Sequence, residues 1–276
     1  MLSPLSIRPC LNARARARVR RAAAIAAAVI CIDTVGAEAV LYDAALGKHP
    51  DEAPWSWTYA PYGVGTIARF FEAGAFVFDT SAFSLPGYAG YGRNAGAVLD
   101  SGAGFSLDFA VRIGAESHAN ANRSGVSLIV TDHSAKGIEL SFWTDEIFAK
   151  NADDGFTHGE SIYLDTRTPR AYRLTFQSGQ YTLVTPGADV LIGALRDYAL
   201  VADPPFNVIP YGTPNYVFFG DNTSSASGRV DVSGITLAPV PEPAQWILLL
   251  AGVACVGGVA GRTRRRGGVS LISGAR

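Results

Sequence analysis

Three carboxylates lie close together in the segment Ile138–Glu146, namely Glu139, Asp145 and Glu146. Retaining glycoside hydrolysis uses two carboxyl groups about 5 Å apart. In an extended strand Glu139 and Asp145 are about 20 Å apart, and the neighbours Asp145 and Glu146 point to opposite faces. The spacing therefore argues against an acid–nucleophile pair, and we expect the protein not to be an enzyme. A glycan-hydrolysing enzyme remains the alternative.

Glu139, Ser141 and Trp143 occupy alternate positions of the same segment. Alternate residues of a strand share one face, so these three side chains form a candidate ligand face. An indole ring flanked by a carboxylate and a hydroxyl is suited to stacking on a sugar. The simpler interpretation is a solvent-facing strand whose aromatic residue is covered by a loop, and the sequence leaves both interpretations open.

Two oxygen-rich segments, Asn151–Gly155 and Gly220–Asn222, are candidates for calcium. Calcium takes six to eight oxygen ligands, and the candidate ligands are Asn151, Asp153, Asp154 and Asp221. Asn, Asp and Gly also dominate ordinary turns, which is the alternative. No cofactor is certain. The histidines lack zinc-site spacing, and no nucleophile elbow, phosphate-binding loop or dinucleotide fingerprint occurs.

These side chains must be positioned by strands. The segments Phe105–Ile113 and Ile138–Thr144 alternate with period two, which is typical of half-buried strands. Gly, Pro, Asn and Asp clusters separate such runs. The predicted fold is all-β, a two-sheet antiparallel jelly-roll sandwich, with further strands at 125–130, 172–176, 181–184, 190–192, 216–219 and 230–237.

Several of these segments resemble concanavalin A-like lectin and laminin G-like domains. The likeness rests on Phe105–Ile113, on the hairpin series Arg170–Phe176, Gln180–Val184 and Val190–Gly193, and on Phe218–Gly228 followed by Val230–Leu237. The resemblance implies a lectin-like sandwich with a binding or structural role. It does not assign the order of strands in residues 38–104.

The formal charge of −1 conceals an uneven distribution. Residues 1–37 hold six arginines and one acid, and residues 244–276 hold five arginines and no acid, whereas residues 38–243 hold 12 basic and 23 acidic residues. An acidic middle segment would be repelled by phosphates, so we exclude nucleic-acid binding. All three cysteines, Cys10, Cys31 and Cys255, lie outside this segment, which therefore has no disulfide and no thiol nucleophile.

The first 37 residues have the pattern of an export signal. Arginines at 14–21 precede the 11-residue uncharged run Ala22–Ile32, which is too short to span a bilayer. Val35 and Ala37 supply the small residues that signal peptidase accepts, so cleavage is predicted between Ala37 and Glu38.

The C-terminal segment has the pattern of a stop-transfer element. The 16-residue uncharged run Trp246–Gly261 would extend about 24 Å as a helix, short of a hydrocarbon core of about 30 Å. Trp246 is expected at the membrane interface, and the arginine cluster on the cytoplasmic side. The cluster comprises Arg262, Arg264, Arg265 and Arg266.

Pro241-Glu242-Pro243, the short apolar run and the arginine cluster follow one another in this order. The arrangement resembles the PEP-CTERM sorting signal of bacterial surface and matrix proteins. That resemblance implies cleavage by an exosortase at or near Pro241–Pro243. The segment 267–276 is longer than is usual after such a cluster.

The expected organisation is a signal peptide (1–37), an exported domain (38–239), a sorting signal with one transmembrane helix (240–266) and a cytoplasmic tail (267–276). We expect transient membrane anchoring, then release to the cell surface or extracellular matrix. The expected partners are signal peptidase, an exosortase and a polysaccharide ligand. A single-pass membrane protein that keeps its anchor is the alternative.

Overall fold

The computed structural model describes residues 38–63, 67–82, 87–153, 155–185, 187, 190–198 and 210–240. The predicted signal peptide, membrane segment, arginine cluster and tail lie outside the described residues, as does the Pro241–Pro243 motif. Within the described residues, no helix is both long enough and apolar enough to span a membrane.

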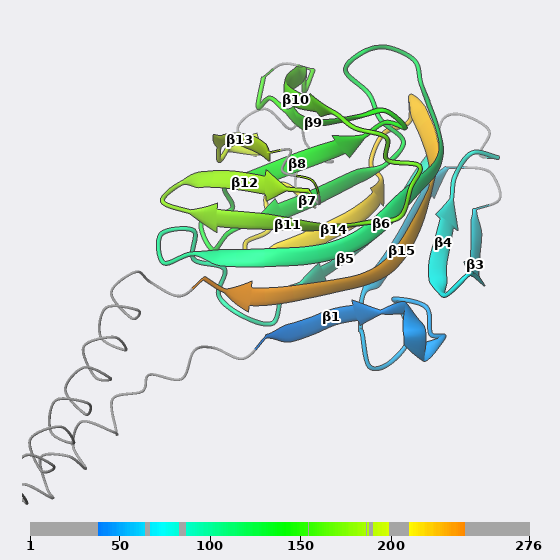
Figure 1. Ribbon diagram of the computed structural model, residues 1–276, viewed down its shortest axis with the longest axis horizontal. Helices are drawn as coiled ribbons and strands as arrows, with labels where there is room; N and C mark the ends of the chain where they lie inside the picture. The colour runs from blue at the N-terminus through cyan, green and yellow to red at the C-terminus, as the bar shows by residue number, and fades with distance from the viewer. Residues whose placement is uncertain are drawn as a thin grey trace, which may run out of the picture. The chain divides into compact units, whose positions relative to one another are not determined.

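The described strands form two antiparallel sheets, which confirms the predicted all-β jelly-roll sandwich (Figure 1). Sheet A has the order β13-β12-β11-β6-β15-β4-β3, and β1 also pairs with β15. Its strands are β1 (Ala39–Asp43), β3 (Ala68–Glu72), β4 (Ala75–Asp79), β6 (Phe105–His118), β11 (Arg170–Gln177), β12 (Gln180–Val184), β13 (Val190–Ala194) and β15 (Ala226–Pro239). A 3-10 turn, η1 (Ala44–Leu46), follows β1.

Sheet B has the order β10-β9-β8-β7-β14-β5-β2. Its strands are β2 (Thr58–Gly63), β5 (Gly87–Asn94), β7 (Ser127–Thr131), β8 (Gly137–Phe142), β9 (Glu146–Lys150), β10 (His158–Tyr163) and β14 (Tyr216–Asp221). Each of the eight segments that the sequence predicts as strands overlaps a strand, although 125–130 begins two residues before β7 and 138–144 ends two residues after β8. The sequence prediction did not identify β9 and β10, nor the strands before Phe105.

The core lies between the sheets, where the alternating apolar residues meet. Phe109 of β6 packs edge-on against Phe142 of β8 and stacks on Tyr172 of β11. Tyr91 of β5 stacks on Phe219 of β14. Period-two alternation thus places one apolar row from each strand in a common interior.

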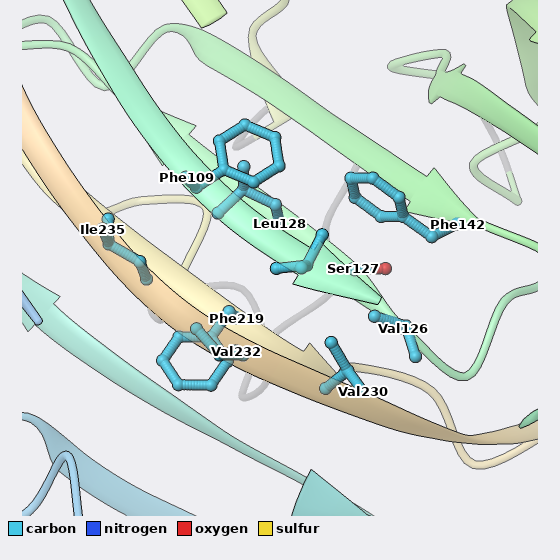
Figure 2. Close-up of a pocket in the computed structure, with 10 residues that line it drawn as sticks. Phe109, Val126, Ser127, Leu128, Phe142, Phe219, Val230, Val232 and Ile235 are labelled. Atoms are coloured by element: carbon cyan, nitrogen blue, oxygen red, sulfur yellow. The ribbon is translucent and has the colours of Figure 1, made fainter. Parts of the chain in front are cut away.

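A cavity of about 20 Å³ lies within this interior (Figure 2). That is room for about one water molecule. Its lining is apolar apart from Ser127, so it is a packing gap rather than a ligand site. The lining residues are Phe109, Val111, Val126, Ser127, Leu128, Phe142, Phe219, Val230, Val232 and Ile235.

Candidate functional site

Glu139 lies on the outward face of sheet B, as its position in β8 predicts, but its side chain is only 2% exposed. Its carboxylate accepts hydrogen bonds from Ser127 Oγ (2.9 Å), Tyr211 Oη (2.6 Å) and Asn222 Nδ2 (3.1 Å). The donors come from β7 and from the segments on either side of β14. Three donors satisfy most of the carboxylate's acceptor capacity.

Lys150 of β9 supplies the positive charge nearest to Glu139 that the structure records. Its Nζ lies 3.9 Å from Glu139 Oε1 and donates to the carbonyl oxygen of Asn122 (2.8 Å). Burial lowers the pKa of the Lys150 ammonium, while the charge of Glu139 raises it. The two groups therefore form a buried ion pair on the outer side of the sheet.

Tyr198 joins β8 to β9 beyond the end of their ladder. Its hydroxyl accepts the N–H of Glu139 (3.0 Å) and donates to the carbonyl of Lys150 (2.7 Å). The last regular pair of these strands is Leu140–Ala149, so the N–H of Glu139 and the carbonyl of Lys150 have no partner across the β8–β9 ladder. The phenol of Tyr198 provides the hydrogen-bond partner for both groups.

Aromatic rings cover this part of the face. Phe156 stacks on both Tyr198 and Tyr211, with ring centroids 5.8 and 5.1 Å apart. These rings pack with Ile129 and Phe218 in a second apolar cluster. Burial raises the pKa of the Tyr211 hydroxyl, and the charge of Glu139 raises it further. Glu139 is therefore enclosed rather than available to a ligand.

Ser141 is also enclosed, and its buried hydroxyl has no hydrogen-bond partner among the described residues. The prediction that Glu139 and Ser141 form an open ligand face is therefore wrong. Alternation correctly places both outward from the core. It does not show that the aromatic residues Tyr198 and Tyr211, about 60 to 70 positions later in the chain, contact Glu139 and enclose it.

Trp143 extends this face beyond the end of β8, and its ring is covered by other rings. His118 stacks on the indole with centroids 4.2 Å apart at 9°, and Phe148 packs against it edge-on at 5.1 Å. The indole N–H donates to the carbonyl of Arg123 (2.8 Å). Of the two interpretations of the sequence, the covered aromatic residue is nearer to this arrangement, but the cover comes from His118 of β6 and Phe148 of β9 and not from a loop.

The two histidines beside Trp143 are bound by carboxylates. His118 Nδ1 lies 2.8 Å from Glu116, and His158 Nε2 lies 3.1 Å from Glu146. Glu146 lies opposite Trp143, about 13 Å along the strand from the level of Glu139. Strand β9 therefore does not bring a second carboxylate to Glu139, and the spacing of a hydrolytic pair is not met there.

The candidate calcium ligands do not converge. Asp153 is bound by Thr157 through its backbone N–H (2.8 Å) and hydroxyl (2.5 Å), and Asn151 also donates to Thr157. Asp221 lies on β14, three strand spacings or about 14 Å from β9. Asp154 lies outside the described residues.

Asp221 is enclosed between the sheets. Its side chain faces the interior, and its carboxyl group is hydrogen-bonded to Thr223 and Thr80. Burial raises the pKa of its carboxyl to about 8. The described residues contain no group of three or more histidines, cysteines or acids placed to hold a metal ion. Asn151 and Asp153 therefore do not form one calcium site with Asp221. Calcium at either segment alone stays a prediction.

An open groove of about 570 Å³ crosses the outer face of sheet A. Its floor is a straight row of small residues, because Ala171 of β11 is opposite Ala110 of β6, and Ala110 is opposite Gly234 of β15. A parallel row of larger residues borders it, formed by Val184, Arg173, Asp108 and Thr236.

Charged pairs line the groove and extend beyond it. Arg173, whose side chain is 63% exposed, donates to both carboxylate oxygens of Asp108 at 2.7 and 2.9 Å. Two outward positions further along β6, beyond Ala110, Arg112 pairs with Asp231 of β15. The sequence prediction missed this groove. In the sequence, only the small residues at outward positions of the strands indicate a groove. Whether they align depends on strand register, which the sequence alone does not give.

No known family model matches the chain, and no curated protein matches it. Solved structures resemble the chain only at low similarity. A carbohydrate esterase from the Shiga toxin-encoding bacteriophage phi24B is 13% identical, with a TM-score of 0.45, and the match covers 66% of this chain and 90% of the esterase. The Ca²⁺-bound VIP36 exoplasmic/lumenal domain is 11% identical, with a TM-score of 0.44, and the match covers 73% and 90%.

Alginate lyase A1-II′, a member of polysaccharide lyase family 7, is 8% identical, with a TM-score of 0.38. That match covers 62% of this chain and 82% of the lyase. No functional conclusion follows from matches at this level.

Proposed function

We propose that this is an exported surface or matrix protein whose sandwich binds a polysaccharide in the groove on sheet A. The carrying observation is the row Ala171–Ala110–Gly234 beside the Arg173–Asp108 pair. This groove is open, whereas Glu139 and Ser141 on sheet B are buried beneath other side chains.

The chemistry of the groove suits a sugar ring. A pyranose has C–H faces, which can rest on the small floor residues, and hydroxyl groups around its rim. Asp108 accepts hydrogen bonds, Arg173 donates them, and the hydroxyl of Thr236 does both. Because Arg173 and Asp108 already hold one another, they present fixed donors and acceptors at little further entropic cost.

The test fills the groove without changing its charges. We expect Ala171→Leu to weaken binding by at least about tenfold, equivalent to about 1.4 kcal/mol. Thr175→Leu, further along the same outward row of β11, is the matched control and should leave affinity unchanged. Isothermal titration of the purified protein with a panel of neutral and uronic-acid polysaccharides measures both. Equal affinity of A171L and the wild type, or no binding by the wild type, contradicts the proposal.

Export and processing belong to the same proposal. The last contact that the structure describes before the motif is the N–H of Val240 donating to the carbonyl of Gly104 (3.1 Å), and Pro241-Glu242-Pro243 follows Val240 in the sequence. Prolines flanking Glu242 favour an extended, unpaired segment, which a processing enzyme needs. We propose that signal peptidase removes residues 1–37 and that an exosortase cuts near Pro241–Pro243.

Mass spectrometry of the protein recovered from cells tests the processing. An N-terminus at Glu38 and a C-terminus near Pro241–Pro243 are expected. A mature chain that still carries Trp246–Arg276 contradicts exosortase cleavage and supports the retained single-pass anchor. The binding measurement is independent of this result.

A further inference from the structure

A carboxyl group lies at the junction of the two sheets. Asp221 ends β14 on the inward side, in line with Val217 and Phe219, and is 0% exposed. Its Oδ1 accepts the backbone N–H of Thr223 (3.1 Å), and its Oδ2 lies 3.0 Å from the hydroxyl of Thr80. Thr80 directly follows β4 of sheet A, so this contact joins sheet B to sheet A.

Thr80 is also hydrogen-bonded to Gly228 of β15. The N–H of Gly228 donates to Thr80 Oγ1 (2.9 Å), the N–H of Thr80 donates to Gly228 O (2.9 Å), and Thr80 Oγ1 lies 3.2 Å from Gly228 O. The single hydroxyl proton of Thr80 therefore has two acceptors within reach, Asp221 and Gly228.

The protonation state of Asp221 decides which acceptor is used. A neutral Asp221 donates its own proton to Thr80 Oγ1, which leaves the Thr80 proton for Gly228 O, and every group is satisfied. An ionised Asp221 accepts the hydrogen bond from the Thr80 hydroxyl, which Gly228 O then lacks, and it has only two donors, Thr80 and Thr223, for a charge that water does not reach. A buried carboxylate with so few donors is strongly disfavoured.

The charged groups on the surrounding elements do not offset that charge. Burial raises the pKa of the Asp221 carboxyl to about 8, and Glu116 of β6 adds repulsion to the same effect. Glu116 is itself bound to His118 and to the N–H of Gly125.

The other neighbouring elements carry charges that already have partners. Asp79 of β4 accepts the N–H of Ser81. Arg229 of β15 pairs with Glu72 and Asp231. Ala89, which is opposite Asp221 on β5, carries no charge.

We propose that Asp221 is a proton-dependent link between the sheets: while its carboxyl is neutral, Thr80 binds both Asp221 and the carbonyl oxygen of Gly228, and when it ionises, the Thr80 hydroxyl turns to Asp221 and the hold on β15 loosens. This regulatory device is independent of the proposed polysaccharide groove. It adds to the exported protein a response to external pH, with Asn222, the next residue, connecting the link to Glu139.

The direction of the pH effect follows from linkage. An aspartate in an unfolded chain ionises near pH 4, whereas Asp221 in the folded protein holds its proton to about pH 8. The contribution of Asp221 to stability is therefore fully present below about pH 4 and is lost as pH rises toward 8. The folding equilibrium constant should fall by up to about tenfold per pH unit in that window.

The test compares the full-length protein in detergent with Asp221→Asn. The amide accepts from Thr223 and donates to Thr80, so it mimics the neutral acid at every pH. Urea unfolding between pH 4.5 and 9, followed by near-ultraviolet circular dichroism, should show the folding constant of the wild type falling relative to D221N as pH rises. Hydrogen exchange, corrected for its intrinsic pH dependence, should show protection of residues 80 and 228 falling near pH 8 only in the wild type.

Glu116→Gln provides a second test that needs no substitution at Asp221. Removing the repelling charge should move the pH midpoint of the exchange change downward. Parallel pH dependence of the wild type and D221N overturns the proposal. If D221N does not fold, an unmoved midpoint in E116Q overturns it, and a lowered midpoint supports it.

Discussion

The two outer faces of the sandwich differ in whether their polar side chains are exposed to solvent. On sheet A, charged residues such as Arg173 and Asp108 pair across neighbouring strands in contact with solvent and border an open groove. On sheet B, Glu139 and Lys150 are paired beneath Tyr198 and Tyr211. Both faces have outward polar residues at alternate positions, so what differs is whether a distant segment covers them.

This difference has an energetic consequence. An exposed ion pair contributes about 0–1 kcal/mol, because water and salt screen it. A buried pair that loses one partner leaves an uncompensated charge at a cost of about 3–5 kcal/mol. The two faces should therefore respond to the same kind of substitution very differently.

The largest effect is expected for Glu139→Ala. The change leaves the Lys150 ammonium buried without its counter-charge and leaves the hydroxyls of Ser127 and Tyr211 without their acceptor. We expect a loss of about 3–5 kcal/mol in the free energy of unfolding, measured by urea denaturation at pH 7. Asp108→Ala on sheet A is the matched control, and its cost should stay within about 1 kcal/mol. Equal costs would show that the two faces do not differ in this way.

Tyr211→Phe separates the contribution of the Tyr211 ring from that of its hydrogen bond to the Glu139 carboxylate. The ring and its stacking on Phe156 remain, whereas the hydrogen bond to Glu139 and the contact with Asn222 are lost. Leaving a buried acceptor short of a donor costs about 1–3 kcal/mol, which the same denaturation measures. Tyr163→Phe, at a residue that is 81% exposed, is the control and should change stability by less than about 0.5 kcal/mol. An unchanged free energy of unfolding in Y211F would mean that a water molecule donates to the Glu139 carboxylate in place of the tyrosine hydroxyl.

The contrast between the faces also shows which features could be predicted from the sequence: the direction of a side chain could be, and its burial by distant residues could not. Alternation in Phe105–Ile113 and Ile138–Phe142 was sufficient to predict strands, the inward row and the all-β sandwich, because strand periodicity is local. It also placed Glu139 outward correctly. It could not predict burial, because Tyr198 and Tyr211 reach Glu139 from 59 and 72 positions away.

Register explains the rest of what the sequence left unresolved. The groove exists only because Ala171, Ala110 and Gly234 align across three strands, and a bulge in β15 between Val232 and Gly234 contributes to that alignment. Likewise, Asp221 in a Gly-Asp-Asn turn suggested calcium, and only the pairing of β14 shows that its carboxyl points between the sheets. Local composition does not encode either fact.

The smallest expected effect is at Ser141, in the middle of the covered face. Its hydroxyl is buried without a partner among the described residues, so folding removes it from water with no compensating hydrogen bond. Such a group costs free energy, and Ser141→Ala should leave stability unchanged or raise it by up to about 1 kcal/mol. Ser127→Ala, its cross-strand neighbour, removes a donor to Glu139 and should lower stability by about 1 kcal/mol. Opposite signs at two adjacent serines, measured by the same urea titration, would show that pairing rather than burial decides the energy of a polar group on this face. A loss of more than about 1 kcal/mol in S141A would show that its hydroxyl has a partner in solution.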